Sequence, residues 1–267
     1  MKILICTKLD LTSCIAVNEL LASFGPDDHE WQLVLSDKVN DAERQLPSQY
    51  DLAFYERDMF LKWSKNLDAV NQRYLSFEKL GERYKVTSEL LKDINTDTRF
   101  LHRIAVWKPD VIVSIRYNYI FKQPLIDLAQ RAVVNLHPGK LPEYGGFYAP
   151  FWAMKNKEKT LTCTLHGITD EKIDSGDIYA EATLPVDLNR SVMWHFTELY
   201  RQGIPELAKL ISNVSSHLTI KGQIQNLNDQ RLFTHPKLDD MVSFEHSGGR
   251  MVSHHDYLEE CEAFFQP

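Results

Sequence analysis

The stretch that decides the fold is VVNLHPGKLP, residues 133–142. It begins as an apolar run typical of a buried strand and ends as a polar loop that contains Pro138 and Gly139. Because side chains alternate along a strand, Asn135 and His137 should point to one side and their neighbours to the other. Pro138 favours extended geometry at His137, and Gly139 permits a sharp turn. An amide and an imidazole are therefore predicted to face one place, with an ordinary strand ending in a polar turn as the alternative.

A second strand is predicted a short way downstream, at residues 161–166 (LTCTLH), and it ends in His166. The acidic loop after it offers Asp170 and Asp174. Acyl-type transfer needs an amide to donate to an oxyanion, an imidazole to move a proton and a carboxylate to orient the imidazole. The candidate catalytic residues are accordingly Asn135, His137 and Asp174.

The motifs of this region resemble those of the folate-dependent formyltransferases. They are NLHP at 135–138, LPxYxG at 141–146, FWA at 151–153, TxTxH at 162–166 and IDSGDI at 173–178. The resemblance is strongest between residues 110 and 200, and its N-x-H and D-x-G elements stand in the order and at the separation that the family uses. It implies N10-formyltetrahydrofolate as the cosubstrate that donates the formyl group.

The resemblance also assigns contacts around the catalytic set. Those to the folate are Tyr117, Asn118, Tyr119, Ile120 and Asp170. Those to the substrate are Tyr144, Gly145, Gly146, Tyr148 and His166. A packed loop is the alternative for the two tyrosines of the first set, because recognition through the backbone leaves little trace in a sequence.

The chain is expected to be an α/β protein with a Rossmann-like open, mostly parallel sheet flanked by helices and a small β-rich C-terminal appendage. Residues 111–115 (VIVSI) are apolar on both faces apart from Ser114, which is typical of a central parallel strand. Other strands are predicted at 2–6, 31–35 and 50–55. Helices are predicted near 13–24 with Ser13 as N-cap, within 59–83, near 96–106 and 150–155, and over 191–214 with a kink or break at Gly203 and Pro205.

Two regions are expected, a catalytic domain over residues 1–213 and a small β-rich region over 214–267. Short strands are predicted in the second region at 218–220, 231–234, 241–244 and 251–252. His254 and His255 are predicted to be a solvated pair, because neighbouring side chains on a strand point opposite ways. No metal site is expected, since the D-x-D-x-D-G and H-x-x-x-H patterns are absent.

Composition suits this arrangement. The 267 residues are 43% hydrophobic, which is ample for a core, and the net charge is −7. The four cysteines, Cys6, Cys14, Cys163 and Cys261, are scattered and are expected to be buried thiols in a reducing compartment. No signal peptide and no apolar run long enough for a membrane span stand out, so we expect a soluble cytoplasmic protein.

The two ends of the chain distinguish among formyltransferases. The turn at residues 7–12 has no glycine, unlike the phosphate-binding turn of the glycinamide ribonucleotide formyltransferases. Residues 204–267 carry five Lys or Arg against nine Asp or Glu, which does not suit a tRNA-binding barrel. Together with SIRY at 114–117 and FWAM at 151–154, this tail looks like that of the nucleotide-sugar N-formyltransferases of bacterial surface-polysaccharide synthesis, in which it commonly forms a dimer interface and helps bind the nucleotide.

The expected reaction is transfer of the formyl group of N10-formyltetrahydrofolate to the amine of a dTDP-linked amino-dideoxy sugar, as in lipopolysaccharide O-antigen biosynthesis. Asn135 would donate to the developing oxyanion, His137 would accept or relay the proton, and Asp174 would orient His137. The expected partner is a nucleotide-linked amino sugar, with the enzyme a homodimer that binds neither nucleic acid nor membrane. The alternatives are a methionyl-tRNA formyltransferase and a catalytically inactive nucleotide-sugar-binding protein on the same fold.

Overall fold

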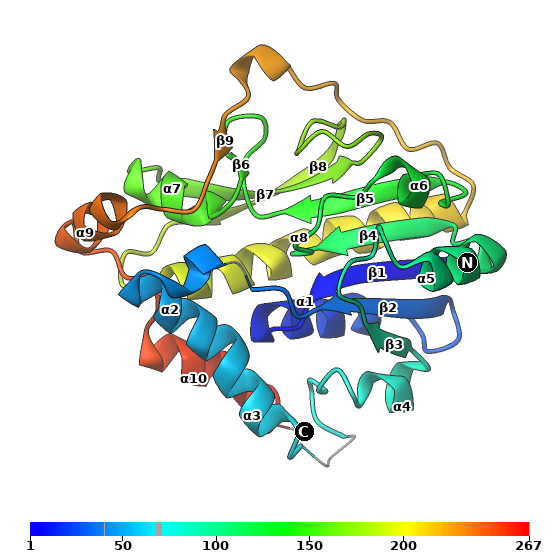
Figure 1. Cartoon of the computed structure of the whole chain (residues 1–267), viewed down its shortest axis with the longest axis horizontal. Coiled ribbons are helices and arrows are strands. Elements are labelled where there is room, and N and C mark those ends of the chain that lie inside the picture. Colours follow the sequence, from blue (N-terminus) through cyan, green and yellow to red (C-terminus); the bar gives the residue numbers. More distant parts are fainter. Residues whose placement is uncertain (40, 68–70, 267) are drawn as a thin grey trace.

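A twisted open sheet forms the centre of the computed structural model, which describes residues 1–39, 41–67 and 71–266 (Figure 1). Within these residues, seven strands pair in the order β3-β2-β1-β4-β5-β7-β8. The first five are parallel to one another, and β7 and β8 run antiparallel. Their bounds are Lys2–Lys8 for β1, Glu30–Ser36 for β2, Thr87–Leu90 for β3, Val111–Ile115 for β4, Ala132–His137 for β5, Thr160–Gly167 for β7 and Ile178–Pro185 for β8. The predicted open, mostly parallel sheet is confirmed.

Helices cover both faces of the sheet (Figure 1). One face carries α1 (Leu11–Ala22) and α8 (Val192–Ser215), and the other carries α5 (Thr98–Trp107) and α6 (Gln123–Ile126). The alternation along β1 shows how both faces are filled. Ile3 and Ile5 pack in the core beneath α1 and α8, whereas Leu4 and Cys6 pack beneath α5. All five residues of β4 are buried, as expected of a central parallel strand.

The link from β1 to α1 is shorter than predicted. β1 continues to Lys8, so most of the predicted turn at residues 7–12 belongs to the strand or to the helix. The N-cap is Asp10 and not Ser13, because the Asp10 carboxylate accepts a hydrogen bond of 2.8 Å from the Ser13 N–H. The Asp10 backbone is extended, which is the conformation that an N-cap requires.

The strand predicted at residues 50–55 is wrong. This segment continues α2 (Pro47–Ala53) into a π-helical turn, η2 (Phe54–Met59), followed by α3 (Phe60–Ser64). A short apolar run does not distinguish a strand from a buried helix, and Pro47 in the first turn starts the helix. The helical segment predicted within 59–83 consists of α3 and α4 (Leu80–Tyr84), and Val70 of that predicted stripe lies outside the described residues.

Helix α8 is one continuous helix that contains Gly203 and Pro205. Of the predicted kink or break at these residues, the break is therefore wrong. Ser191 caps α8 by accepting a hydrogen bond from the Trp194 N–H. The glycine serves packing. A Cβ at Gly203 would lie 2.7 Å from Cys163 Sγ and 2.9 Å from Leu136 Cδ1, so glycine lets the helix lie directly on β5 and β7.

The C-terminal region is mainly helical, which corrects the prediction of a β-rich appendage. The segment predicted as a strand at 241–244 lies in α9 (Leu238–His246), where Met241 and Phe244 share one buried helical face. His254 and His255 are exposed, as predicted, but they begin α10 (His254–Glu262) and do not lie on a strand. The predicted strands at 218–220 and 251–252 are not formed. The strand predicted at 231–234 corresponds to β9 (Leu232–Phe233), which pairs with β6 (Gly145–Gly146). Pro267 lies outside the described residues.

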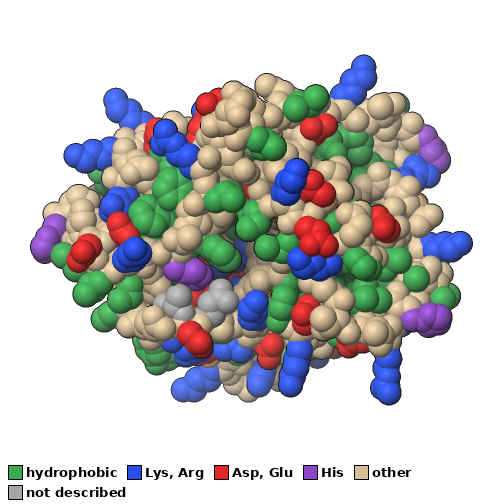
Figure 2. All heavy atoms as spheres, turned by 45° about the horizontal axis from the view of Figure 1, so that its top comes forward, with side chains coloured by type: hydrophobic (Ala, Val, Ile, Leu, Met, Phe, Trp, Pro, Cys, Tyr) green, Lys and Arg blue, Asp and Glu red, His purple; other side chains and the backbone are tan. Residues whose placement is uncertain are grey.

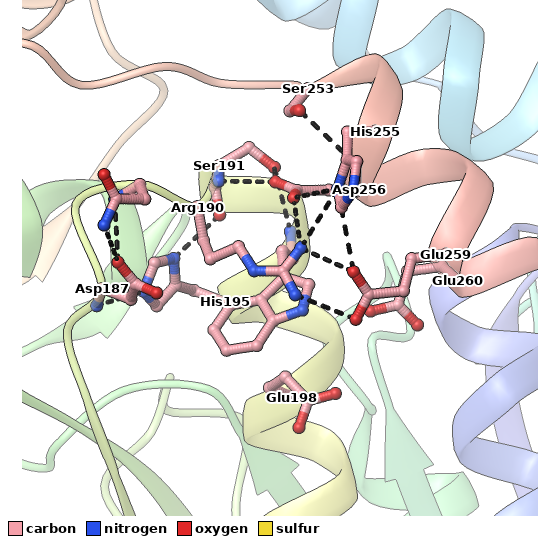
Figure 3. Close-up of polar contacts among 12 residues, drawn as sticks. Asp187, Arg190, Ser191, His195, Glu198, Ser253, His255, Asp256, Glu259 and Glu260 are labelled. Atoms are coloured by element: carbon pink, nitrogen blue, oxygen red, sulfur yellow. Dashed lines mark hydrogen bonds and ion pairs between the residues drawn. The ribbon is translucent and has the colours of Figure 1, made fainter.

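A buried ion-pair network attaches α10 to the start of α8 (Figure 3). The Asp256 carboxylate accepts hydrogen bonds from the Ser191 N–H at 2.7 Å, the Ser191 Oγ at 2.6 Å and Arg190 Nη1 at 2.8 Å. Burial tends to raise the pKa of Asp256, but these donors outweigh it and lower that pKa below its usual value. The three hydrogen bonds to the Asp256 carboxylate therefore fix α10 to the start of α8.

Two further predictions can be compared with the fold. All four cysteines are buried free thiols, as expected. None of the helices in the described ranges combines the length and the apolar character that crossing a membrane requires.

Candidate active site

Asn135 and His137 both line a cavity of about 280 Å³ at the carboxyl ends of the parallel strands. Val134 and Leu136 pack on the other face of the sheet, in the core beneath α8, and Leu136 also borders the cavity. The alternation predicted from the sequence is thus confirmed, and β5 delivers an amide and an imidazole to one wall. A crevice beyond the carboxyl ends of the strands is the usual ligand position in open α/β sheets.

His166 reaches the same wall because β5 and β7 pair antiparallel, with Asn135 opposite His166. Asn135 Nδ2 lies 3.1 Å from His166 Nε2, and His166 Nδ1 lies 2.9 Å from the Gly167 carbonyl oxygen. The Gly167 carbonyl oxygen can only accept, so His166 Nδ1 donates to it, and His166 Nε2 faces the Asn135 amide. The second N–H of that amide is then left for a ligand in the cavity.

The Asp174 carboxylate lies between the two imidazoles. Its Oδ2 is 3.7 Å from His137 Nδ1, and its Oδ1 is 3.4 Å from His166 Nε2. The Gly146 N–H donates to Oδ2 at 2.8 Å. Asp174 also makes the turn, with φ of 50° in the left-handed region. The turn and the catalytic interpretations of this residue therefore do not exclude each other.

Burial alone would raise the pKa of Asp174, because an ion is poorly solvated there. The neighbouring charges of His137 and His166 and the hydrogen bond from Gly146 outweigh burial and hold that pKa well below its usual value. His137 Nε2 lies 2.8 Å from the Tyr144 carbonyl oxygen, so both ring nitrogens of His137 face oxygen acceptors. A doubly protonated ring satisfies both acceptors, and this arrangement suits a group that takes up a proton during a reaction.

Gly139 is required for space at this wall. A Cβ there would lie 2.3 Å from the Tyr144 carbonyl oxygen and 2.6 Å from His137 Nε2. The close approach of these atoms, more than the freedom of the glycine backbone, explains the residue. Any side chain at position 139 would separate the imidazole from its carbonyl acceptor.

The predicted folate contacts lie along one side of the cavity, whose lining includes Tyr117, Asn118, Tyr119, Ile120 and Asp170. A hydrogen bond fixes the loop over residues 116–121, since Asn118 Nδ2 donates to the Lys38 carbonyl oxygen at 2.6 Å. The Lys38 ammonium lies 4.2 Å from the centre of the Tyr119 ring. The Tyr117 hydroxyl is buried and has no hydrogen-bond partner among the described residues.

The predicted substrate contacts divide into two groups. Gly146, Tyr148 and His166 line the cavity. Tyr144 and Gly145 lie behind its wall, where the Tyr144 ring stacks on Phe233 and Gly145 pairs with β9. The contribution of Tyr144 to the site is its carbonyl oxygen, which accepts from His137.

Sequence reasoning assigned no role to five further residues that line the cavity, Lys8, Glu43, Glu56, Arg116 and His235. Arg116 Nη2 lies 3.0 Å from an Asp10 oxygen and 2.8 Å from a Glu56 oxygen. Burial alone would lower the pKa of Arg116, but the two carboxylates raise it above its usual value. A polar residue directly after the central strand was a usable signal for Arg116. Glu56 was obscured because its segment had been predicted as a strand.

One group of side chains in the described ranges could be considered for a metal ion, namely His255, Asp256 and Glu259 (Figure 3). It lies at α10 and contributes nothing to the cavity wall. Arg190 Nη1 already supplies a positive charge, at 2.8 Å from Asp256 and 2.6 Å from Glu259. We therefore assign this group a structural role.

With the geometry in place, the chain can be compared with known proteins. The family model described as "Formyl transferase" matches residues 69–202, half of the chain. This range contains Asn135, His137, His166 and Asp174. The matched range leaves out four other residues that line the cavity, Lys8, Glu43, Glu56 and His235.

Curated relatives share part of the sequence. The chain is 27% identical over 169 residues to the methionyl-tRNA formyltransferase of Halalkalibacterium halodurans, which covers 63% of this chain and 49% of that protein. It is 30% identical over 114 residues to the bifunctional polymyxin resistance protein ArnA of Wigglesworthia glossinidia brevipalpis, covering 43% of this chain and 17% of that protein. The chain thus spans half or less of the length of these relatives.

Among solved structures, the fold is similar to that of an N-formyltransferase from Helicobacter canadensis in complex with folinic acid and dTDP-3-aminofucose. The TM-score is 0.57 at 15% sequence identity, over 99% of this chain and 80% of that chain. At this identity the likeness concerns the fold.

Proposed function

Because the chain belongs to the formyl transferase family, we propose that it transfers the formyl group of N10-formyltetrahydrofolate to the amine of a nucleotide-linked amino-dideoxy sugar, with dTDP as the nucleotide. The observation that carries this proposal is the cluster of Asn135, His137 and Asp174 in one cavity. The same cavity is lined by the loop over residues 116–121, which suits a folate. Surface-polysaccharide synthesis is the process in which such a product would be used.

The residues present fit a folate. A pterin is a flat heteroaromatic ring that needs apolar walls and hydrogen-bonding groups at its edge. Ile120, Phe121 and Ile168 supply apolar surface in the cavity, and the Tyr117 hydroxyl is a buried polar group without a protein partner. The loop over residues 116–121 would hold the ring, and Asp170 lies on the same lining.

Bound formyltetrahydrofolate would supply an activated one-carbon group, and the chain would supply positioning and proton transfer. The second N–H of the Asn135 amide would stabilise negative charge as it develops on the formyl oxygen. His137 would accept the proton that the attacking amine loses, since its Nδ1 faces the Asp174 carboxylate. His166 Nε2 lies 3.1 Å from the Asn135 amide nitrogen and 3.4 Å from Asp174 Oδ1, and this packing would keep the amide aligned. A new C–N bond to the acceptor amine replaces the formyl bond to the folate, and the released proton returns to the folate nitrogen.

Two observations support a sugar acceptor. The Helicobacter canadensis N-formyltransferase, whose complex contains dTDP-3-aminofucose, has a similar fold over 99% of the present chain. The tail is acidic, with nine Asp or Glu against five Lys or Arg in residues 204–267. We further propose that residues 214–267 contribute to the interface of a homodimer and to nucleotide binding.

The experiment that tests the proposal is a panel of dTDP- and UDP-linked amino sugars, each incubated with the protein and formyltetrahydrofolate and analysed by product mass. We expect one sugar to gain one formyl group. The panel should contain 3-amino and 4-amino sugars of both gluco and galacto configuration. If no sugar on it is formylated while an unrelated amine is, the sugar acceptor is refuted and formyl transfer stands.

Methionyl-tRNA formylation is the alternative that the curated relatives suggest, since the Halalkalibacterium halodurans protein carries that name. On the face drawn in Figure 2, side chains of both charge signs are interspersed, so its described residues present no broad basic surface for a phosphate backbone. We expect tRNA affinity no better than the non-specific range of about 10⁻⁴ to 10⁻⁶ M at physiological salt. Sub-micromolar binding of initiator tRNA would favour that alternative.

A catalytically inactive sugar-binding protein is distinguished by the absence of turnover with both substrates present.

A further inference from the structure

The segment that follows α8 lies over the loop that carries Asp174, although it is distant in the sequence and outside the family match at residues 69–202. Gln223 forms an isolated antiparallel bridge with Ile178 at the edge of the sheet. Two residues later the Gln225 side chain turns inward and is 8% exposed. The chain then reaches β9, which pairs with β6 beside the catalytic cluster.

Gln225 holds the backbone of the catalytic loop. Its Nε2 donates to the Asp174 carbonyl oxygen at 3.1 Å and to the Gly176 carbonyl oxygen at 2.6 Å. Both neighbours are acceptors, so the amide must face them with its NH₂ group. One side chain thus fixes the carbonyl groups on both sides of Ser175.

Asp174 needs such support. Its φ of 50° lies in the left-handed region, which is disfavoured for a residue with a Cβ. Its carboxylate has one hydrogen bond, from the Gly146 N–H, and otherwise depends on the loop to stay between His137 and His166. A small rotation of the loop would change both carboxylate–imidazole distances.

The same C-terminal segment also holds the donor to that carboxylate. The Gly145 N–H donates to the Arg231 carbonyl oxygen at 2.9 Å, and the Phe147 N–H donates to the Phe233 carbonyl oxygen at 2.9 Å. These bonds fix the strand in which the Gly146 N–H points at Asp174. Gly146 itself has φ of 85°, and a Cβ there would lie 2.3 Å from the Phe233 carbonyl oxygen.

We infer that Gln225 is a positioning residue for formyl transfer, one that keeps the Asp174 carboxylate between His137 and His166 from outside the family-matched part of the chain. This inference rests on the proposed function, because it presumes that Asp174 supports catalysis. The role is indirect, since Gln225 is not among the residues that line the cavity.

The test uses the full chain with two substitutions at one site and one matched control. Gln225→Met keeps the length of the side chain but removes both donors, and kcat should fall by about 10 to 10² with KM for folate and acceptor nearly unchanged, as expected of a small displacement of a catalytic group. Gln223→Met is the control, because the Gln223 side chain is exposed and its bridge to Ile178 uses only backbone atoms. It should keep wild-type kcat.

Gln225→Glu separates positioning from packing. Its shape matches glutamine, but an ionised carboxylate would face two carbonyl oxygens, so at neutral pH kcat should fall further than in Gln225→Met. As the pH is lowered toward the ordinary glutamate pKa of about 4.3, protonation restores one donor, and the ratio of variant to wild-type kcat should rise. A purely structural role would leave this ratio independent of pH.

Wild-type kcat in Gln225→Met, an equal loss in Gln223→Met, or a pH-independent ratio in Gln225→Glu would overturn the inference. Melting temperatures measured in parallel identify any variant that fails to fold. Asp174→Asn separates a failure of the proposed catalytic role of Asp174 from a failure of the proposed positioning role of Gln225. If it is fully active, the proposed role of Asp174 is wrong, whereas an inactive Asp174→Asn beside a fully active Gln225→Met refutes only the role of Gln225.

Discussion

Asp174, which is partly buried, and Asp256, which is buried, both have a pKa that is lowered by their surroundings, yet their carboxylates are bonded in different ways. Asp256 accepts three hydrogen bonds of 2.6 to 2.8 Å from Ser191 and Arg190. Asp174 accepts one of 2.8 Å, and its other neighbours are imidazole nitrogens at 3.4 and 3.7 Å. The Asp174 carboxylate therefore has more acceptor capacity left than that of Asp256.

The partners differ as well. The Arg190 guanidinium is always charged, so the Asp256 network has a single state and serves as an anchor. Asp174 faces two imidazoles instead, and imidazole is the side chain that most often acts in general acid–base catalysis. A carboxylate with titratable partners and spare acceptor capacity is suited to proton transfer, and one with permanent partners is suited to stability.

The largest expected effect is that of Asp174→Asn. Asparagine serves turns as well as aspartate does, so the fold and melting temperature should change little. Loss of the negative charge beside His137 should lower kcat by about 10² to 10⁴, the range for impaired acid–base catalysis. Steady-state kinetics with thermal unfolding as the control would measure both. Full activity in this variant would return Asp174 to the role of a turn residue and erase the contrast with Asp256.

Asn135→Ala should have the next largest effect, a reduction of kcat by about 10² to 10³ with little change in folate affinity. The amide is expected to act on charge that develops only in the transition state. It also contacts His166 at 3.1 Å, so its removal tests whether the cluster works as a unit. A change confined to KM would remove Asn135 from that role.

Asp256→Ala should affect stability and leave chemistry intact. Arg190 keeps Glu259 as a partner, but the buried Ser191 N–H and hydroxyl lose their acceptor. The loss should be about 3 kcal/mol, because each buried donor left without a partner costs about 1 to 3 kcal/mol. The melting temperature should fall by roughly 10 °C in a chain of this size. Turnover of the folded variant at low temperature should equal that of the wild type, and a large loss of kcat there would contradict the division of roles.

The smallest expected effect is on the pH dependence of stability. The folded pKa of Asp256 is lowered, so its contribution is fully present above the unfolded value of about 3.9 and is lost as the pH falls through the folded value. Urea unfolding of the wild type and Asp256→Asn should therefore differ most at neutral pH and converge below about pH 4. If the difference in unfolding free energy stays constant down to about pH 3, hydrogen-bond geometry, and not charge, dominates at this site.

The local features of the site were predictable. The alternation that aims Asn135 and His137 at one wall depends only on strand geometry, and Asp174 follows from motif order. What failed were choices that tertiary contacts decide. The apolar run at 50–55 and the pair Met241 and Phe244 are compatible with strand or helix, and only the surrounding core selects the helix.

The residues that were missed make contacts across long separations in the chain. Arg116 meets Asp10 and Glu56 across 106 and 60 positions, and Gln225 meets Asp174 across 51. No local pattern announces such a contact, because a glutamine in a polar segment looks like any solvated side chain. The N-cap of α1 was misplaced for a smaller reason, since both Asp10 and Ser13 are good capping residues and the extended backbone at Asp10 decides between them.

The residues that line the cavity differ in origin along the chain, and this has a consequence for how such enzymes change. Asn135, His137, His166 and Asp174 lie within the family-matched residues 69–202, while Lys8, Glu43, Glu56 and His235 come from the flanks. Mutations that reshape the flanks can alter which acceptor is accepted without disturbing the groups that move the formyl group. Laboratory evolution toward a new amine should therefore begin with Lys8 at the end of β1, Glu43, Glu56 in η2 and His235 after β9, and leave β5 as it is.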